Sequence, residues 1–120
     1  MTAQTGRAIV NFGAGIPWEM REYRVPDPEP GAVIVRITMA SICGTDVHLY
    51  QGDFGAAGGG RQNPSIAGHE FVGRVHRLGA GVTVDTVGQP LKEGDRVVWS
   101  PSIICGRCPA CLRDVLPSLS

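Results

Sequence analysis

Two short segments of the chain concentrate side chains that can bind a metal and move protons. The first segment reads Cys43-Gly44-Thr45-Asp46-Val47-His48, and the second reads Gly68-His69-Glu70. Thiolate and imidazole are the ligands that zinc prefers. A hydroxyl, a second imidazole and two carboxylates accompany this pair, and such groups serve in proton transfer. The two segments therefore predict a catalytic metal site rather than a purely structural one.

The glycine spacing after the second segment points to a known family. Gly68-His69-Glu70-Phe71-Val72-Gly73 is followed by five residues before Gly79 and by two more before Val82. Together with the Cys-Gly-x-Asp-x-His of the first segment, this pattern resembles the signature of the zinc-dependent medium-chain alcohol dehydrogenases. The resemblance extends from Arg7 to the cysteine cluster near residue 111. It implies a GroES-like barrel and an oxidoreductase that acts on alcohols.

The resemblance implies a role for each group of the metal site. Cys43 would be a thiolate ligand and His69 a neutral imidazole ligand of a catalytic Zn²⁺, which acts as a Lewis acid on an alcohol oxygen. Glu70 would approach the zinc as an alternate ligand. Asp46 would accept a hydrogen bond from the His69 ring and orient that ring. Taken singly, a cysteine is more often a small buried hydrophobe than a ligand.

Thr45 and His48 are the expected proton-transfer residues. By resemblance, the Thr45 hydroxyl takes the proton of the alcohol and His48 relays that proton to solvent. Two simpler interpretations stay open: Thr45 caps the helical turn that follows it, and His48 is a surface residue of that turn. The third histidine, His76, lies within an expected strand, and we interpret it as structural or exposed.

A second metal site is indicated near the end of the chain. Its three thiols are separated by two-residue gaps: Cys105, Cys108 and Cys111. In the family a fourth cysteine completes a Cys₄ structural zinc site, but here the corresponding position is Leu119, or Ser120 if one residue is inserted. Asp114 or water could supply a fourth ligand to three thiolates. Three unligated thiols in a loop are the alternative.

Short strands are expected to position these groups. Alternating apolar and polar residues predict a strand at 32–42, which runs directly into Cys43. Further strands are expected at 7–12, 18–25, 71–78 and 96–99, with a weak edge strand at 82–87. Residues 45–50 suit a single helical turn capped by Thr45 or Asp46, and residues 51–65 form a long glycine-rich loop. The predicted fold class is all-β (mainly β), a partly open barrel with short helical turns and a cysteine-rich metal lobe.

Composition sets the remaining bounds. The 120 residues carry 11 Lys and Arg against 11 Asp and Glu, so nothing favours binding to nucleic acid or to an anionic membrane. We expect one domain, 1–120, that buries roughly two-thirds of its unfolded surface. No stretch is long and apolar enough to cross a membrane. Clustered cysteines suit metal ligation in a reducing compartment, so we expect a cytoplasmic protein.

Hydride transfer requires a nicotinamide cofactor, and its binding motif is missing. No Gly-x-Gly-x-x-Gly lies between a strand and a helix, so the sequence indicates a C-terminally truncated catalytic domain without a Rossmann domain. We expect the substrate-side domain of a zinc-dependent NAD or NADP enzyme, inactive alone, that acts on a small alcohol or polyol; a homo-oligomer stays open. A stand-alone, non-catalytic zinc-binding β-domain is the alternative. The zinc-free quinone reductases are disfavoured because Cys43 and His69 are both present.

Overall fold

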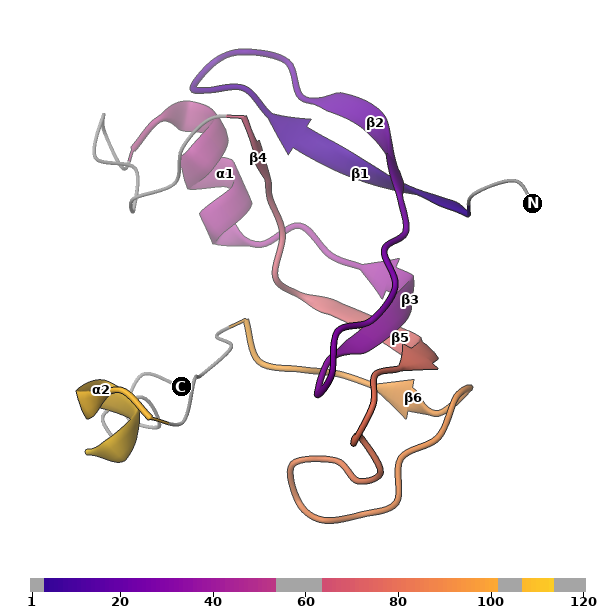
Figure 1. Ribbon diagram of the computed structural model, residues 1–120. Coiled ribbons are helices and arrows are strands. Elements are labelled where there is room, and N and C mark those ends of the chain that lie inside the picture. Colours follow the sequence, from indigo (N-terminus) through magenta and orange to yellow (C-terminus); the bar gives the residue numbers. More distant parts are fainter. Residues whose placement is uncertain (1–3, 54–63, 102–106, 114–120) are drawn as a thin grey trace.

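The computed structural model describes residues 4–53, 64–101 and 107–113. Strands outnumber helices in these ranges, which confirms the all-β prediction (Figure 1). The elements are β1 (Thr5–Asn11), β2 (Glu19–Arg24), β3 (Val33–Ala40), α1 (Gly44–Gln51), β4 (Ser65–Ile66), β5 (Phe71–Leu78), β6 (Arg96–Val97) and α2 (Pro109–Leu112). Among these residues no helix is long and apolar enough to span a membrane.

The strands form two antiparallel sheets of three strands each. The first sheet has the order β2-β1-β4, and the second has the order β3-β5-β6. The chain passes from the first sheet to the second after β2 and again after β4 (Figure 1). The described strands do not close into a barrel, so the prediction of a partly open barrel is confirmed.

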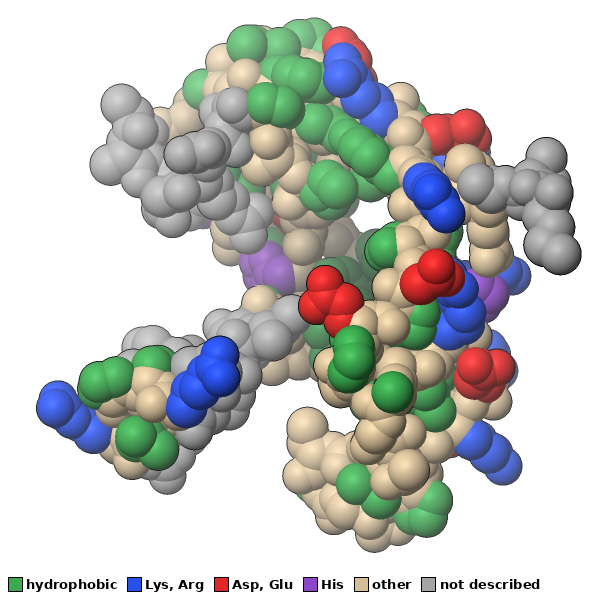
Figure 2. Space-filling view, viewed as in Figure 1, with side chains coloured by type: hydrophobic (Ala, Val, Ile, Leu, Met, Phe, Trp, Pro, Cys, Tyr) green, Lys and Arg blue, Asp and Glu red, His purple; other side chains and the backbone are tan. Residues whose placement is uncertain are grey.

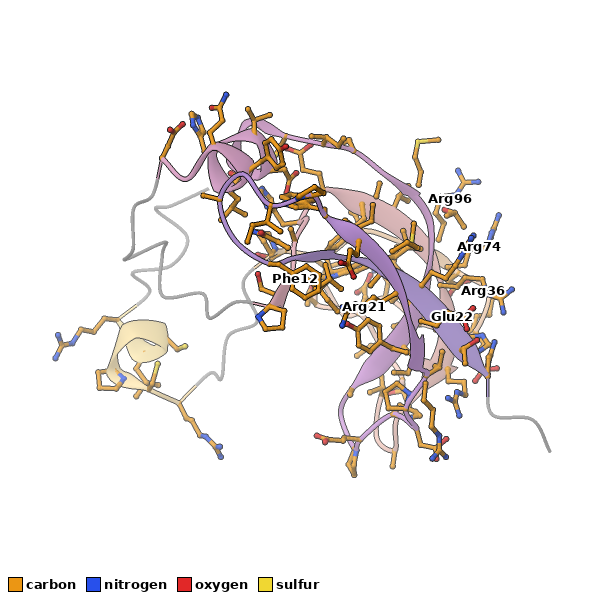
Figure 3. The ribbon with its side chains drawn as sticks, turned by 90° about the horizontal axis from the view of Figure 1, so that it is seen from above. Phe12, Arg21, Glu22, Arg36, Arg74 and Arg96 are labelled. Atoms are coloured by element: carbon orange, nitrogen blue, oxygen red, sulfur yellow. The ribbon has the colours of Figure 1, made fainter. Side chains whose placement is uncertain are left out.

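The second sheet has one face with buried side chains and an opposite face that is exposed to solvent. Val75 of β5 is buried, whereas its neighbour Arg74 points to the opposite face and is exposed. Arg74 pairs with Arg36 on β3 and with Arg96 on β6, so three exposed arginines form one row across the sheet. Figure 3 shows the three side chains together on one side of the molecule. We call this set the arginine row.

A glycine permits the close contact between β3 and β5. A Cβ atom on Gly73 would lie 2.5 Å from Val35 Cγ1 and 2.6 Å from the backbone oxygen of Arg36. The register of the two strands shifts on either side of this point, between Ile34 and Val35 and between Ile37 and Met39. Only a residue without a side chain fits here, which explains the glycine that interrupts the otherwise regular strand pattern.

Helix α1 is longer than the single turn that the sequence predicts. It has eight residues, and its N-cap is Cys43 rather than Thr45 or Asp46. Gly52 ends the helix in the left-handed conformation, with φ of 80°, and its N–H donates to the His48 carbonyl at 2.9 Å. Cys43 thus lies three residues after the end of β3 and immediately before the first residue of α1.

Several other element boundaries differ from the sequence-based expectations. The expected edge strand at 82–87 is replaced by a turn with one bridge, between Val84 and Pro90. Asp85 stabilises this turn by accepting hydrogen bonds from the N–H groups of Val87 and Gln89. The expected strand at 96–99 is reduced to β6, and the unexpected strand β4 begins at the last residue of the expected loop 51–65.

The interior is small for a chain of this length. A folded protein of 12.7 kDa typically exposes about 6,200 Å². This structure exposes 9295 Å², about half of the unfolded surface, so the expectation of two-thirds burial is wrong. Val10 and Val75 are the buried hydrophobic residues in the described ranges. Hydrophobic side chains instead reach the surface over β1, β2 and α1 (Figure 2).

Candidate metal centre

Cys43 is positioned by the junction between β3 and α1. Its backbone is extended, with φ of −109° and ψ of 178°, and the helix starts at the next residue. Its N–H donates to Asp46 Oδ2 at 3.0 Å, so the carboxylate of the first helical turn fixes the N-cap. This contact belongs to a capping box: the Asp46 side chain at N3 accepts the N–H of the N-cap, and the Cys43 side chain accepts the N–H of Asp46. The thiol is thereby held at the end of the strand.

His69 and Glu70 lie at the corresponding end of the neighbouring strand. Ala40 of β3 pairs with Phe71 of β5, so the segment that precedes β5 meets the segment that follows β3. Ser41 joins the two segments twice. Its N–H donates to the Glu70 carbonyl at 3.0 Å, and its hydroxyl donates to Glu70 Oε2 at 2.6 Å. Residues far apart in the sequence are therefore brought together by the antiparallel pairing itself.

The geometry of this cluster fits a zinc ion. Cys43, His69 and Glu70 each offer one ligand atom, and the three atoms lie within 4.8 Å of one another. Cys43 Sγ lies 3.5 Å from His69 Nε2. Zn–S and Zn–N bonds of ordinary length at a tetrahedral angle separate S and N by about 3.6 Å, so the pair already has the required spacing. Cys43 and His69 are half-buried, whereas Glu70 is exposed.

Asp46 contacts a different ligand from the one that the sequence predicted. The expected hydrogen bond to the His69 ring is absent from the contacts of the described residues, because the carboxylate turns toward the N–H of Cys43. Asp46 is only 5% exposed, and its Oδ1 atom has no hydrogen-bond partner in the described part of the chain. Its position in the first turn also places its negative charge near the positive end of the helix.

The two expected proton-transfer residues lie on α1. Thr45 borders a cavity together with His69, whereas His48 is exposed one turn further along the helix. His48 Nδ1 lies 2.7 Å from Asp53 Oδ2, just after the helix end. The roles of Thr45 and His48 in proton transfer stay predictions.

The cysteine lobe is described only in part. Cys108 is the N-cap of α2 and Cys111 lies within that helix. Their Sγ atoms are 3.3 Å apart, which exceeds the ~2.05 Å of a disulfide bond. Cys105, Asp114, Leu119 and Ser120 lie outside the described residues. The structural zinc site and its fourth ligand therefore stay predictions.

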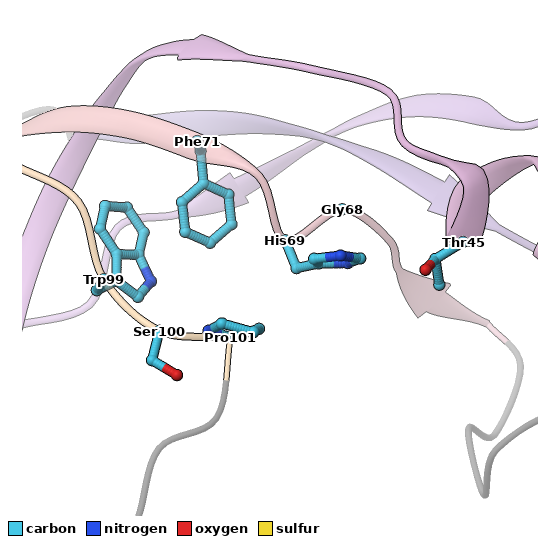
Figure 4. Close-up of a pocket in the computed structure, with 7 residues that line it drawn as sticks. All are labelled: Thr45, Gly68, His69, Phe71, Trp99, Ser100 and Pro101. Carbon is cyan, nitrogen blue, oxygen red and sulfur yellow. The ribbon is translucent and has the colours of Figure 1, made fainter. Parts of the chain in front are cut away.

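A cavity of about 350 Å³ opens beside the metal cluster (Figure 4). Phe71 and Trp99 form one wall, with ring centroids 4.1 Å apart and planes inclined by 32°. The remaining lining residues are Thr45, Gly68, His69, Ser100 and Pro101. Because the last two and Gly68 are exposed, one side of the cavity faces solvent. His69 thus belongs both to the metal cluster and to the cavity wall.

Sequence reasoning missed four residues around this site. Ser41 holds Glu70, Asp53 holds His48, and the pair Phe71 and Trp99 forms the cavity wall. Ser41 and Phe71 adjoin the metal-binding segments, so proximity in sequence was an available signal for them. Trp99 carries no such signal, because its contact with Phe71 depends on the alignment of distant strands.

The family match supports the interpretation of this site. Residues 29–117 match the alcohol dehydrogenase GroES-like domain. The chain is 44% identical over 93 residues to 5-exo-hydroxycamphor dehydrogenase of Pseudomonas putida, covering 78% of this chain and 25% of that protein. It is 38% identical over 106 residues to L-threonine 3-dehydrogenase of Pyrococcus horikoshii, covering 88% of this chain and 28% of that protein. The chain thus spans about a quarter of the length of these relatives.

Solved structures give the same result. An alcohol dehydrogenase from Thermotoga maritima superposes with a TM-score of 0.79 at 33% identity, over 97% of this chain and 30% of that one. The apo form of a zinc-dependent alcohol dehydrogenase from Streptococcus pneumonia gives a TM-score of 0.67 at 32% identity, over 89% of this chain and 28% of that one. The chain therefore belongs to the alcohol dehydrogenase GroES-like domain family, within the zinc-dependent medium-chain dehydrogenases.

Proposed function

We propose that this chain forms the substrate-side, zinc-binding domain of an NAD- or NADP-dependent alcohol or polyol dehydrogenase. The observation that carries the proposal is the 3.5 Å contact between Cys43 Sγ and His69 Nε2 at the border of the cavity. Bound zinc supplies Lewis-acid polarisation of an alcohol or carbonyl oxygen. A nicotinamide cofactor would supply the hydride acceptor in the complete enzyme. Cysteines that bind metal rather than form disulfides are typical of a reducing compartment, so we also propose that the protein is cytoplasmic.

Each residue of the site has a distinct task in this proposal. Cys43 as a thiolate and His69 as a neutral imidazole hold the metal, and Ser41 keeps the exposed Glu70 carboxylate near them. The Thr45 hydroxyl borders the cavity and accepts the proton that the alcohol loses. His48 lies at the exposed end of α1 and passes this proton to water, with Asp53 bound to its Nδ1 atom.

Surface exposure favours this function over a stand-alone zinc-binding β-domain. Met39, Ile42 and Val98 are 71%, 83% and 73% exposed, respectively. A domain that works alone gains stability by covering such side chains, because burial of a large aliphatic side chain contributes roughly 1.5–3 kcal/mol. Their exposure is expected of a domain that packs against further protein. The purified chain should therefore self-associate more readily than a self-sufficient domain does.

Cobalt binding tests the metal centre directly. Co²⁺ replaces Zn²⁺ in thiolate and imidazole sites and gives visible absorption bands that report the ligand geometry. To remove the lobe thiols, the experiment uses a chain in which Cys105, Cys108 and Cys111 are replaced by serine. We expect this chain to bind one cobalt ion per molecule with a thiolate charge-transfer band. Cys43→Ser should abolish that band, and His69→Gln should weaken binding and shift the bands.

His76→Gln is the matched control for the histidine substitution. His76 lies in β5, where its Nε2 atom is 2.9 Å from Gln4 Oε1, and it is not part of the metal cluster. This variant should bind cobalt as the parent chain does. Retention of the charge-transfer band in Cys43→Ser would contradict the assigned ligand set. So would a folded parent chain, shown by its circular dichroism, that takes up no cobalt.

A further inference from the structure

Two aromatic rings form one wall of the cavity beside the metal centre. Phe71 starts β5 two residues after His69, and Trp99 follows β6 by two residues. Their rings are in contact, yet both side chains are only half-buried. An aromatic pair usually gains stability by burying its faces. Here part of that apolar surface is left accessible in the cavity (Figure 4).

The described residues that line the cavity include no Asp, Glu, Lys or Arg. Their polar side-chain groups are those of Thr45, His69 and Ser100 and the indole N–H of Trp99. A polyol or an amino-acid alcohol has a polar group on almost every carbon. Each such group that is removed from water without a partner costs about 1–3 kcal/mol. This wall therefore disfavours such molecules and favours a hydrocarbon body with a single hydroxyl.

The size of the cavity adds a second constraint. Its volume of about 350 Å³ lies at the small end of ligand pockets, which range from about 300 to 1,000 Å³. Phe71 and Trp99 provide a flat wall, and Thr45 and His69 lie in the same cavity. A cavity of this size with a flat aromatic wall suits a compact ring with one hydroxyl better than a long chain.

We propose that Phe71 and Trp99 select a compact, apolar, ring-bearing alcohol or the corresponding ketone as the substrate. This inference rests on the proposed function and narrows its substrate class from alcohols and polyols to alicyclic alcohols. The two rings contact the hydrocarbon body of the substrate, and the Thr45 hydroxyl hydrogen-bonds its oxygen. The aromatic wall is thus the specificity element of this part of the site.

Cyclohexanol and inositol form the matched pair of probes, because both are six-membered carbon rings and they differ in the number of hydroxyl groups. The chain has two tryptophans, so Trp18→Phe leaves Trp99 as the only indole reporter. In the zinc-loaded Trp18→Phe chain, cyclohexanol should change the Trp99 fluorescence in a saturable manner. Inositol should produce no saturable change at the same concentrations. Phe71→Leu in this background should weaken cyclohexanol binding about tenfold, since ring contacts contribute this order of affinity.

A second reporter excludes a general solvent effect. In Trp99→Phe the remaining indole is Trp18, which contacts Tyr50 on the far end of α1. Its fluorescence should not respond to cyclohexanol. Equal responses to the two probes, a stronger response to inositol, or no response to either would overturn the inference. These results leave the proposed function standing if cobalt still binds to Cys43 and His69, whereas loss of cobalt binding in the parent chain refutes the proposed function itself.

Discussion

Replacing Asp46 by alanine should weaken both the fold and the metal centre. The carboxylate accepts the N–H of Cys43 at 3.0 Å and is 5% exposed. In Asp46→Ala this half-buried N–H loses its partner, and the N-cap residue is also a candidate metal ligand. The substitution should therefore disturb both the start of α1 and the position of the Cys43 thiolate. A purely structural cap would change stability without changing metal affinity.

The structure gives the size of both effects. Loss of a hydrogen bond to a charged group costs about 1.5–3 kcal/mol, and loss of an N-terminal cap costs about 0.5–2 kcal/mol. Both values refer to the same contact between Asp46 and Cys43 and are therefore not added. We expect the free energy of unfolding to fall by about 2 kcal/mol. Residues that hold a metal ligand in place typically contribute 10–100-fold to metal affinity. We expect cobalt affinity to fall by about this factor.

The assay combines urea unfolding of the metal-free chain with cobalt titration of the chain that lacks the lobe cysteines. Asp46→Asn is the conservative variant, because its amide oxygen can still accept the N–H of Cys43. It should recover most of the stability. Gln51→Ala, at the exposed end of the same helix, should change neither quantity by more than the error. Unfolding within about 0.5 kcal/mol of the parent chain, with cobalt affinity within about threefold, would refute the positioning role of Asp46.

Three further predictions concern the sheet and the reaction. Gly73→Ala should lower the unfolding free energy in urea by about 2–3 kcal/mol, because the new Cβ would overlap Val35 and the backbone of Arg36; Gly44→Ala, which meets nothing within 4 Å, should be tolerated. Arg36→Glu should raise the unfolding free energy by about 0.5 kcal/mol at low salt, because it replaces repulsion of Arg74 by attraction; an equal gain in 1 M salt would contradict this cause. The purified, zinc-loaded chain should not reduce NAD or NADP with a panel of alcohols, and steady reduction above a zinc-free control would show that it is self-sufficient.

The sequence predicts those parts of the fold that depend on local patterns. The alternation before Cys43 predicts β3 because side chains in a strand point to opposite faces in turn. Helix α1 is underestimated because Gly44, its first residue, is a poor helix former and cysteine is an uncommon N-cap. Strand β4 has two residues, and its partners Val10 and Asn11 are distant in sequence, so no local pattern could indicate it.

The same distinction applies to the candidate site. The metal-binding segments were found from residue type and spacing, and the structure brings Cys43, His69 and Glu70 together. The orientation of the His69 ring by Asp46 stays a prediction. The described contact of Asp46 is a capping interaction with the N–H of Cys43, three residues away in sequence, which competes with a contact across the site. The contact between Phe71 and Trp99 depends on the register of β5 against β6, which sequence spacing does not determine.

The arginine row has a consequence for how copies of this chain meet in solution. Two molecules that approach with these faces together would set three guanidinium groups against three more, well within the Debye length of about 8 Å at physiological salt. Their mutual repulsion keeps this face of the sheet in water. Collisions between molecules are then steered toward other surfaces, such as the one that exposes Ile42. Repulsion between arginine rows therefore restricts the relative orientations in which two molecules of this protein can associate in a concentrated solution.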